Sequence, residues 1–309
     1  MKTIRFIVFP GAFNWPLWVA QRMGWFREAG LEVQLTPTPG SVFQLTGLID
    51  GEFDLGITLI DNVVAYREGQ GEVPALGKDL IGLMAHDTRT LPALVTLPDV
   101  RSYADLRGRT LSLDATRTGY ANVLYAMLEK GGLGRDDYKL ESIGGVKQRF
   151  ESLLAHQHAG ALFNSPFESL LEARGFTRLD TARSVASSYQ GMVVAGRREW
   201  IAANRAAVVG VLRALLRAIA WLYDPANRAA AFKIHDEEIP GASAGSAATA
   251  HGILFHPQHG LPKDGQIEPD AVAAVLDLRS RFGVPQRTLG SPQDYYDLRY
   301  LDDARKIGV

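Results

Sequence analysis

The stretch "FPGAFNWPLWVAQRMGWF" (residues 9–26) contains three of the chain's five tryptophans and lies where a strand-like run gives way to a helical one. The preceding run, "TIRFIVF" (residues 3–9), is typical of a β-strand. Pro16 suits the first turn of a helix and Gly30 the position just past its end, so the pattern predicts a helix over residues 16–29. The aromatic side chains therefore mark a turn between a strand and a helix.

The same alternation continues along the chain. Strand-like runs recur at residues 31–37 and 54–58, and again at residues 110–114 and 160–164, with helical runs between them. This β–α–β–α order with short turns predicts an α/β protein whose mainly parallel sheets are covered by helices.

The β–α alternation is interrupted at residues 79–99 and then begins again, which predicts two lobes. We expect residues 1–88 and 193–309 to form a discontinuous first lobe that includes a helical C-terminal tail, and residues 89–192 to form the second lobe. A tail of this length must pack against another part of the chain, and a return to the first lobe is the simplest solution. The chain then crosses between the lobes twice, near residues 86–91 and 190–196.

Composition narrows the classes of function. The 309 residues carry 33 basic and 34 acidic side chains, so electrostatic binding to nucleic acid is not expected. No stretch approaches the roughly 18–20 apolar residues that cross a bilayer. Cysteine is absent, which excludes a disulfide, a thiolate nucleophile and a cysteine-based zinc site.

Several phrases resemble a known family. Residues 9–33 are similar to the start of the NMT1-like periplasmic solute-binding proteins of ABC transporters, the nitrate, sulfonate, taurine and thiamine-precursor group. Their "G-x-F-x-x-x-G-L-x-V" phrase corresponds here to Gly24, Phe26, Gly30, Leu31 and Val33. The segments "LIDGEFDLGIT" and "SYADLRGRTLSLD" are similar to two further phrases of that family, in the same order along the chain.

The resemblance implies a type II periplasmic-binding-protein fold, with two lobes joined by a two-crossing hinge. It implies capture of a small molecule in the cleft by lobe closure, and delivery to the membrane permease and ATPase of an ABC importer. We expect a monomer in the periplasm. The first residues do not form a secretory signal, so either a leader has been removed or the protein is cytoplasmic.

Candidate ligand-binding residues follow the strands of the first lobe, because ligands bind beyond the carboxyl ends of strands in open α/β sheets. Phe13, Asn14 and Trp15 follow the first strand. Either the Trp15 indole stacks on a flat ligand or it packs the helix onto the sheet.

Two further turns of the first lobe carry candidates. Gly40 and Ser41 follow the second strand, where Ser41 either binds an acidic group or forms a capping box with Gln44. Thr58, Asp61 and Asn62 follow the third strand, and Asp61 either caps the next helix or binds a ligand nitrogen.

In the second lobe, the candidates again precede helices. Thr116, Arg117 and Thr118 either bind an anionic group or form an exposed turn with Thr118 as the N-cap. The remaining candidates lie after the strand at residues 160–164 and near the second crossing; they are Asn164, Phe167, Tyr189 and Gln190.

Binding is favoured over catalysis. Enzymes of this fold, a sulfinate desulfinase and a pyrimidine synthase, are associated with essential cysteines, and this chain has none. The sequence predicts no catalytic residue, metal site or cofactor. The predicted ligand is flat, aromatic or heterocyclic, with a carboxylate, sulfonate or other polar group. The alternatives are a ligand sensor or a cytosolic enzyme, such as an aromatic-acid decarboxylase that uses His86 and Arg89, or an enzyme of pyrimidine metabolism.

Overall fold

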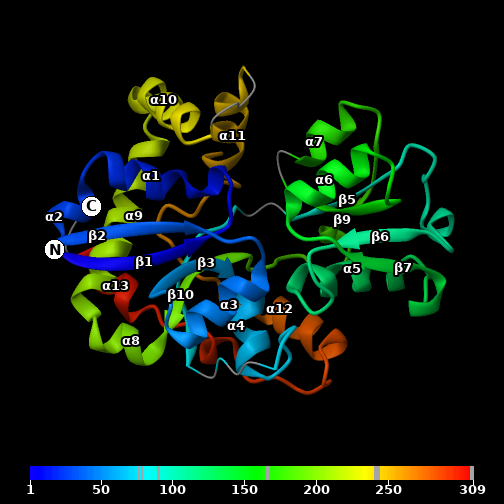
Figure 1. Ribbon diagram of the computed structural model, residues 1–309, viewed down its shortest axis with the longest axis horizontal. Coiled ribbons are helices and arrows are strands. Elements are labelled where there is room, and N and C mark those ends of the chain that lie inside the picture. The colour runs from blue at the N-terminus through cyan, green and yellow to red at the C-terminus, as the bar shows by residue number, and fades with distance from the viewer. Residues whose placement is uncertain (75–76, 78, 89–90, 165–166, 240–243, 307–309) are drawn as a thin grey trace.

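The computed structural model describes residues 1–74, 77, 79–88, 91–164, 167–239 and 244–306. The molecule has two lobes, and both chain termini lie in the larger one (Figure 1). The strands are β1 (Lys2–Val8), β2 (Leu31–Pro37), β3 (Leu55–Leu59), β4 (Leu80–Ala85), β5 (Ala93–Thr96), β6 (Thr110–Leu113), β7 (Lys139–Ser142), β8 (Gly160–Phe163), β9 (Thr177–Thr181) and β10 (Met192–Arg197).

Helices cover these strands. They are α1 (Trp15–Arg22), α2 (Trp25–Glu28), α3 (Ser41–Asp50), α4 (Ile60–Arg67), α5 (Gly119–Lys130), α6 (Val146–Leu154), α7 (Phe167–Glu172), α8 (Arg198–Ala203), α9 (Arg205–Tyr223), α10 (Arg228–Glu238), α11 (Ser246–Leu254), α12 (Pro269–Phe282) and α13 (Arg299–Lys306). The single helix predicted over residues 16–29 is two helices, because Gly24 adopts a left-handed conformation (φ 75°) between α1 and α2.

The first lobe is built on a five-stranded sheet in the order β2-β1-β3-β10-β4. β1 runs parallel to β2 and β3, whereas β10 runs antiparallel to both β3 and β4. The sheet is therefore mixed. β10 follows the second lobe in the sequence and returns to this sheet, where it lies between β3 and β4.

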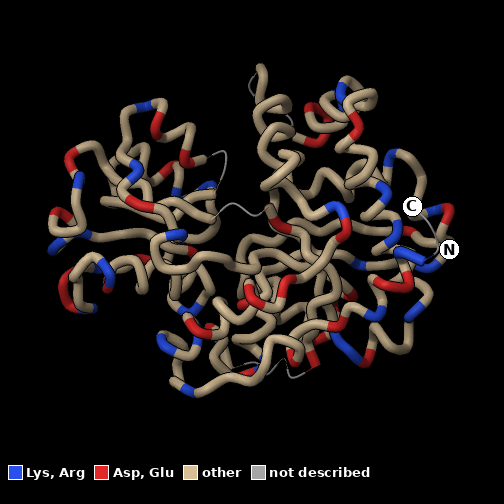
Figure 2. The backbone as a smooth tube through the Cα atoms, turned by 180° about the vertical axis from the view of Figure 1, so that it is seen from behind, with Lys and Arg blue, Asp and Glu red and all other residues tan. Residues whose placement is uncertain are grey.

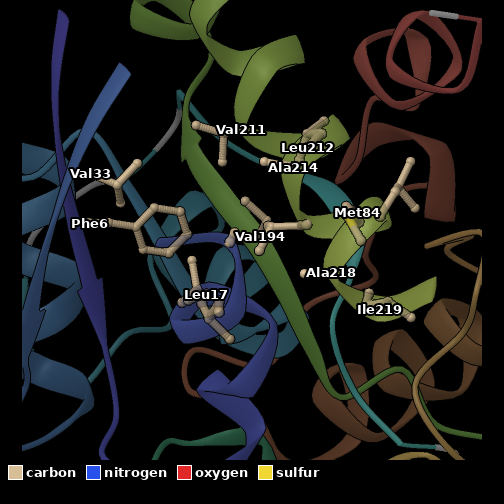
Figure 3. Packing of buried hydrophobic residues seen from close by; sticks show 14 of the residues in the cluster. Phe6, Leu17, Val33, Met84, Val194, Val211, Leu212, Ala214, Ala218 and Ile219 are labelled. Carbon is tan, nitrogen blue, oxygen red and sulfur yellow. The ribbon is translucent and has the colours of Figure 1, made fainter. Parts of the chain in front are cut away.

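Side chains alternate across this sheet and build a core on each face. Phe6 of β1 and Val194 of β10 pack with Leu17 of α1 and with α9 on one face (Figure 3). Val193 and Ala195, the neighbours of Val194, belong to the cluster on the opposite face with α3, α4 and α12. This period of two is what a strand buried on both faces requires.

The second lobe differs from the parallel sheet that we predicted. Its three-stranded sheet has the order β8-β5-β9, and β5 runs antiparallel to both neighbours. Only the two-stranded β6–β7 ladder is parallel. β5 and β9 lie outside the strand runs that the sequence pattern identified, so the alternation from which a parallel sheet was predicted does not hold in this lobe.

The long helix α9 shows that a second prediction was wrong. By length and composition it is apolar enough to cross a bilayer, contrary to our expectation that no such stretch exists. Its apolar side chains, including Val208, Leu212 and Leu215, are buried in the first-lobe core against α1 and α13. We therefore assign α9 to the core of the protein.

The C-terminal tail contacts both lobes. α9 and α13 pack on the first lobe, as expected of a returning tail. α12 contributes Val272 and Val275 to the first-lobe core but Leu278 to the core of the second lobe. The predicted lobe boundaries stay a prediction, and residue 89, at one of them, lies outside the described residues.

Candidate functional site

A cavity of about 410 Å³ lies between the lobes and is lined by residues of both. The first lobe contributes the turns after β1 and β2 and the ends of β3 and β4, and the second lobe contributes the ends of β6 and β8 and the first turns of α5 and α6. Strand ends and helix N-termini thus converge on one space, as in other open α/β proteins. Its volume falls within the range of small-molecule sites, about 300–1,000 Å³.

Seven of the fifteen predicted site residues line this cavity. They are Phe13, Ser41, Thr58, Asn62, Thr118, Asn164 and Phe167. The rule that ligands bind at strand ends therefore identified one side of the cavity in each lobe. Thr118 also has its alternative role, because its hydroxyl accepts a hydrogen bond from the Ala121 amide as the N-cap of α5.

Trp15 does not line the cavity. Its side chain is fully buried, and its indole Nε1 donates to the Ala231 carbonyl at 3.2 Å. The rings of Phe232, His235, His251 and Phe255 surround it, with centroids 4.8–6.5 Å away. The packing alternative is therefore correct, and Trp15 fixes α1 against α10 and α11.

Asn14 acts on the backbone of the β1–α1 turn. Its Nδ2 donates to the Phe9 carbonyl at 2.7 Å, and the residue is buried outside the cavity lining. The preceding Phe13 does line the cavity, and its carbonyl accepts from His86 Nε2 at 2.9 Å. Asn14 thus shapes the turn that presents Phe13.

Asp61 forms a buried ion pair and is neither a helix cap nor part of the cavity lining. The Arg279 guanidinium donates to both Asp61 oxygens, at 2.6 and 2.5 Å, and the two side chains are 0% and 1% exposed. Arg279 Nη2 also donates to the Arg117 carbonyl at 2.8 Å. The charge of Asp61 is therefore used to join α4, α12 and the second lobe.

Thr116 and Arg117 also contact the first lobe. Glu72 accepts from the Thr116 hydroxyl at 3.1 Å and from the Arg117 amide at 2.8 Å, and Arg117 Nη1 donates to the Gly71 carbonyl at 3.3 Å. Neither residue lines the cavity. This turn therefore forms an interlobe contact in place of the predicted anion site.

The remaining predicted residues lie close to the cavity without lining it. A Cβ at Gly40 would lie 3.9 Å from Asp114 Oδ1, and the backbone there is extended. Tyr189 packs on the Tyr120 ring at 6.2 Å. Gln190 is buried and its Nε2 donates to the Met192 carbonyl at 3.4 Å.

Ser41 has a different role from the predicted capping box. Its hydroxyl donates to Asp114 Oδ2 at 2.7 Å, from the start of α3 to the end of β6. Gln44 instead donates to the Ile57 carbonyl at 2.9 Å. Both Ser41 and Asp114 line the cavity, so this hydrogen bond spans the cleft between the lobes.

Arg149 lines the cavity but was not predicted. It lies in the first turn of α6, is 8% exposed, and donates from Nη1 to the Leu162 carbonyl at 2.7 Å. Its Nε has no hydrogen-bond partner among the described residues. Burial lowers the pKa of Arg149, but a guanidinium stays charged at neutral pH. The sequence carried no signal for it, because the exposed Lys147 is a basic residue of the same helical turn.

His86 also lines the cavity, and it is fully buried at the end of β4. Because the Phe13 carbonyl can only accept, Nε2 carries the proton and Nδ1 is an acceptor. Nδ1 has no partner among the described residues. Burial lowers the pKa of His86 to about 4, so the imidazole is neutral at pH 7.

Asp87 follows His86 and is partly buried in the cavity wall. Desolvation raises the pKa of its carboxyl group to about 7, although the backbone amides of Met192 and Thr88 donate to it. A Cβ at Gly191 would lie only 1.5 Å from Asp87 Oδ2, so the carboxylate occupies the space that a side chain at position 191 would need.

Charge is otherwise distributed evenly. Figure 2 shows Lys and Arg interspersed with Asp and Glu over both lobes. In the described part of the chain, no group of three His, Asp or Glu side chains could hold a metal ion. The cavity wall itself is mostly apolar, and its charged groups are therefore individually significant.

Comparison with known proteins places these features in a family. Residues 14–229 match the family described as NMT1/THI5 like. A search of curated proteins finds no match. A structure from Bordetella bronchiseptica RB50 shares 20% identity at a TM-score of 0.81, covering 99% of this chain and 98% of the other.

Two further structures have stated functions. The alkanesulfonate-binding protein SsuA from Xanthomonas axonopodis pv. citri, bound to MOPS, shares 17% identity at a TM-score of 0.74, with 96% and 99% of the two chains covered. The desulfurization enzyme DSZB shares 16% identity at a TM-score of 0.65, with 100% of both chains covered. At these identities the likeness shows the fold, which is the two-lobed α/β fold of periplasmic binding proteins.

Proposed function

Because the chain belongs to the NMT1/THI5-like family, we propose that it is the substrate-binding component of an ABC importer. It captures a small organic ligand in the cavity between its lobes and holds it by lobe closure. Membrane permease and ATPase subunits are then its partners, the periplasm its compartment, and the monomer its working form.

The buried Arg149 is the main observation that supports an acidic ligand. A guanidinium that is desolvated, lines an apolar cavity and keeps an unpartnered Nε favours a carboxylate or sulfonate beside it. Residues 145–148, at the N-terminus of α6, line the same part of the cavity and add the favourable end of the helix dipole.

Aromatic side chains favour a flat ligand body. Phe13 of the first lobe and Phe167 of the second lobe both line the cavity, so the two lobes can enclose a ring between them. Ile253 and Leu254 of α11 extend the apolar wall. The proposed ligand is therefore an aromatic or heterocyclic acid of moderate size.

Thermal shifts test the proposal. A panel of aromatic carboxylates and sulfonates should contain members that raise the melting temperature, because a ligand that binds only the folded state stabilises it. Arg149→Gln should weaken binding of those members at least tenfold, about 1.4 kcal/mol. Arg183→Gln, at an exposed position of the same lobe, is the matched control. A panel without any shift, or equal affinity in the Arg149 variant, would contradict the proposal.

An enzyme on the same scaffold is the second candidate. The similarity to a desulfurization enzyme favours it, as do two titratable groups with shifted pKa values in one cavity. Arg89, the proposed partner of His86 in a decarboxylase, lies outside the described residues. Mass spectrometry distinguishes the candidates: a binding protein returns its ligand unchanged, whereas an enzyme converts it.

A further inference from the structure

The cavity has a second polar end, opposite in character to Arg149. His86 and Asp87 line it from the first lobe, at the end of β4, whereas Arg149 lines it from the second lobe. His86 Nδ1 is an acceptor without a partner among the described residues, and Asp87 contributes carboxylate oxygens. Above about pH 7 the Asp87 carboxyl group is ionised and, like His86 Nδ1, can only accept hydrogen bonds, so neither group then suits an acidic ligand group.

Of these two residues, His86 is the stronger evidence for a hydrogen-bond donor on the ligand. It is fully buried, and a buried nitrogen without a partner costs free energy unless a ligand or water satisfies it. The Nε2 bond to the Phe13 carbonyl fixes the tautomer, so the free Nδ1 must accept. A group that donates a hydrogen bond is the complement of this site.

Asp87 adds charge to the same end. None of the ion pairs recorded between described residues includes it, and its neighbour Arg89 lies outside those residues. Asp114, the other carboxylate that lines the cavity, accepts from the Ser41 hydroxyl, whereas Asp87 accepts from the backbone amides of Met192 and Thr88. Tyr120 lines the same cavity as Asp87 and Arg149, and the charges of these two groups act in opposite directions on the pKa of its hydroxyl.

We propose that the ligand is amphoteric: its acidic group binds Arg149 and the start of α6, and a nitrogen that donates hydrogen bonds binds His86 Nδ1 and the Asp87 carboxylate. This inference rests on the proposed function and narrows its substrate class from aromatic acids to acids that also carry an amine or a ring N–H. The two ends belong to different lobes, so such a ligand bridges the cleft and favours closure.

Matched probes test the inference by calorimetry. The first set is 4-(aminomethyl)benzoate, 4-methylbenzoate and 4-methylbenzylamine, and the second is 3-aminopropanesulfonate with propanesulfonate. In at least one set the amphoteric probe should bind ten times more tightly than the acid that lacks nitrogen. Asp87→Asn should reduce that preference to less than threefold, and Asp136→Asn, at an exposed position of the second lobe, should preserve it.

Gly191→Ala gives an independent test. The new Cβ would displace the Asp87 carboxylate, so this variant should lose the same preference while still binding the acid. The wild-type ratio decides the question even if a variant fails to fold. Equal binding of acids with and without nitrogen overturns the inference and leaves the proposed function standing. Absence of binding by every acid overturns both, and a preference that survives both variants overturns the role of Asp87.

Discussion

His86 has a protonation state set by its surroundings. Its Nε2 donates to the Phe13 carbonyl at 2.9 Å, and no anionic partner for a second proton is recorded among the described residues. Protonation would therefore bury an uncompensated charge, and this is why burial lowers the pKa of His86 to about 4. Asp87 shows the opposite effect of the same environment, since desolvation raises the pKa of its carboxyl group to about 7.

These shifts predict opposing effects of pH on stability. The unfolded chain protonates His86 near its ordinary pKa of about 6.5, but the folded protein does so only near 4. The stability due to His86 is complete above about pH 6.5 and declines as the pH falls toward 4. The carboxyl group of Asp87 instead contributes stability below about pH 4, and that contribution is lost as the pH rises through about 7.

Urea unfolding of wild type and His86→Gln at pH 7.5 and pH 5.0 isolates the histidine, because the contribution of Asp87 is common to both proteins. The wild type should lose up to about 2 kcal/mol more than the variant over this interval. Glutamine keeps a donor that can reach the Phe13 carbonyl. Identical pH dependence in the two proteins would mean that His86 is not desolvated as described.

Residues of the site were predictable only where a turn follows a recognised strand. Phe13 and Thr58 follow strands whose apolar pattern is plain in the sequence, and both line the cavity. His86 follows β4, which we did not predict as a strand, so its place at a strand end was hidden. Arg149 lies within a helix, and nothing local distinguishes a buried basic residue from a solvated one.

At the scale of elements, the first three strands show how far local sequence patterns predict the fold. β1, β2 and β3 lie within one or two residues of the predicted strands, because alternation of apolar side chains is a local property. The sequence "TRLDT" of β9 has no such pattern, since this strand is only partly buried. The antiparallel sheet of the second lobe therefore could not be predicted.

Trp15 decides how α1 meets α10 and α11. Trp15→Ala should lower the free energy of unfolding by about 3–5 kcal/mol, because it removes a fully buried indole and leaves a cavity among Phe232, His251 and Phe255. Trp15→Phe should cost less, since it keeps most of the packing and loses the hydrogen bond to the Ala231 carbonyl. Urea denaturation measures both values. Unchanged stability with abolished ligand binding would instead support the stacking role.

At the scale of the whole molecule, α12 limits how the lobes can move. It lies at the junction of the lobes (Figure 1) and contributes side chains to the cores of both. Its Arg279 also joins Asp61 to the Arg117 carbonyl through buried hydrogen bonds. Separation of the lobes here would expose an ion pair and apolar surface, so we expect this side of the junction to stay closed.

The hydrogen bond from Ser41 to Asp114 is then the contact across the cleft that opening would break. Ser41→Ala removes it without changing the ion pair at α12. The variant without ligand should populate an open state more, with a larger radius of gyration in X-ray scattering than the wild type. Its affinity for the acid with the largest thermal shift should fall by about 0.5–1.5 kcal/mol, the usual net contribution of one hydrogen bond.

Ser169→Ala, at an exposed position on α7, controls for the loss of a hydroxyl as such and should scatter like the wild type. Saturating ligand should return the Ser41 variant to the compact form, because the proposed ligand would contact both lobes and supply the free energy of closure that the hydrogen bond no longer provides. Scattering curves that superpose for Ser41→Ala and wild type, both without ligand and at saturation, would show that closure does not depend on this contact. The lobes would then be held together by α12 and by the contacts of Thr116 and Arg117 with Glu72 and Gly71.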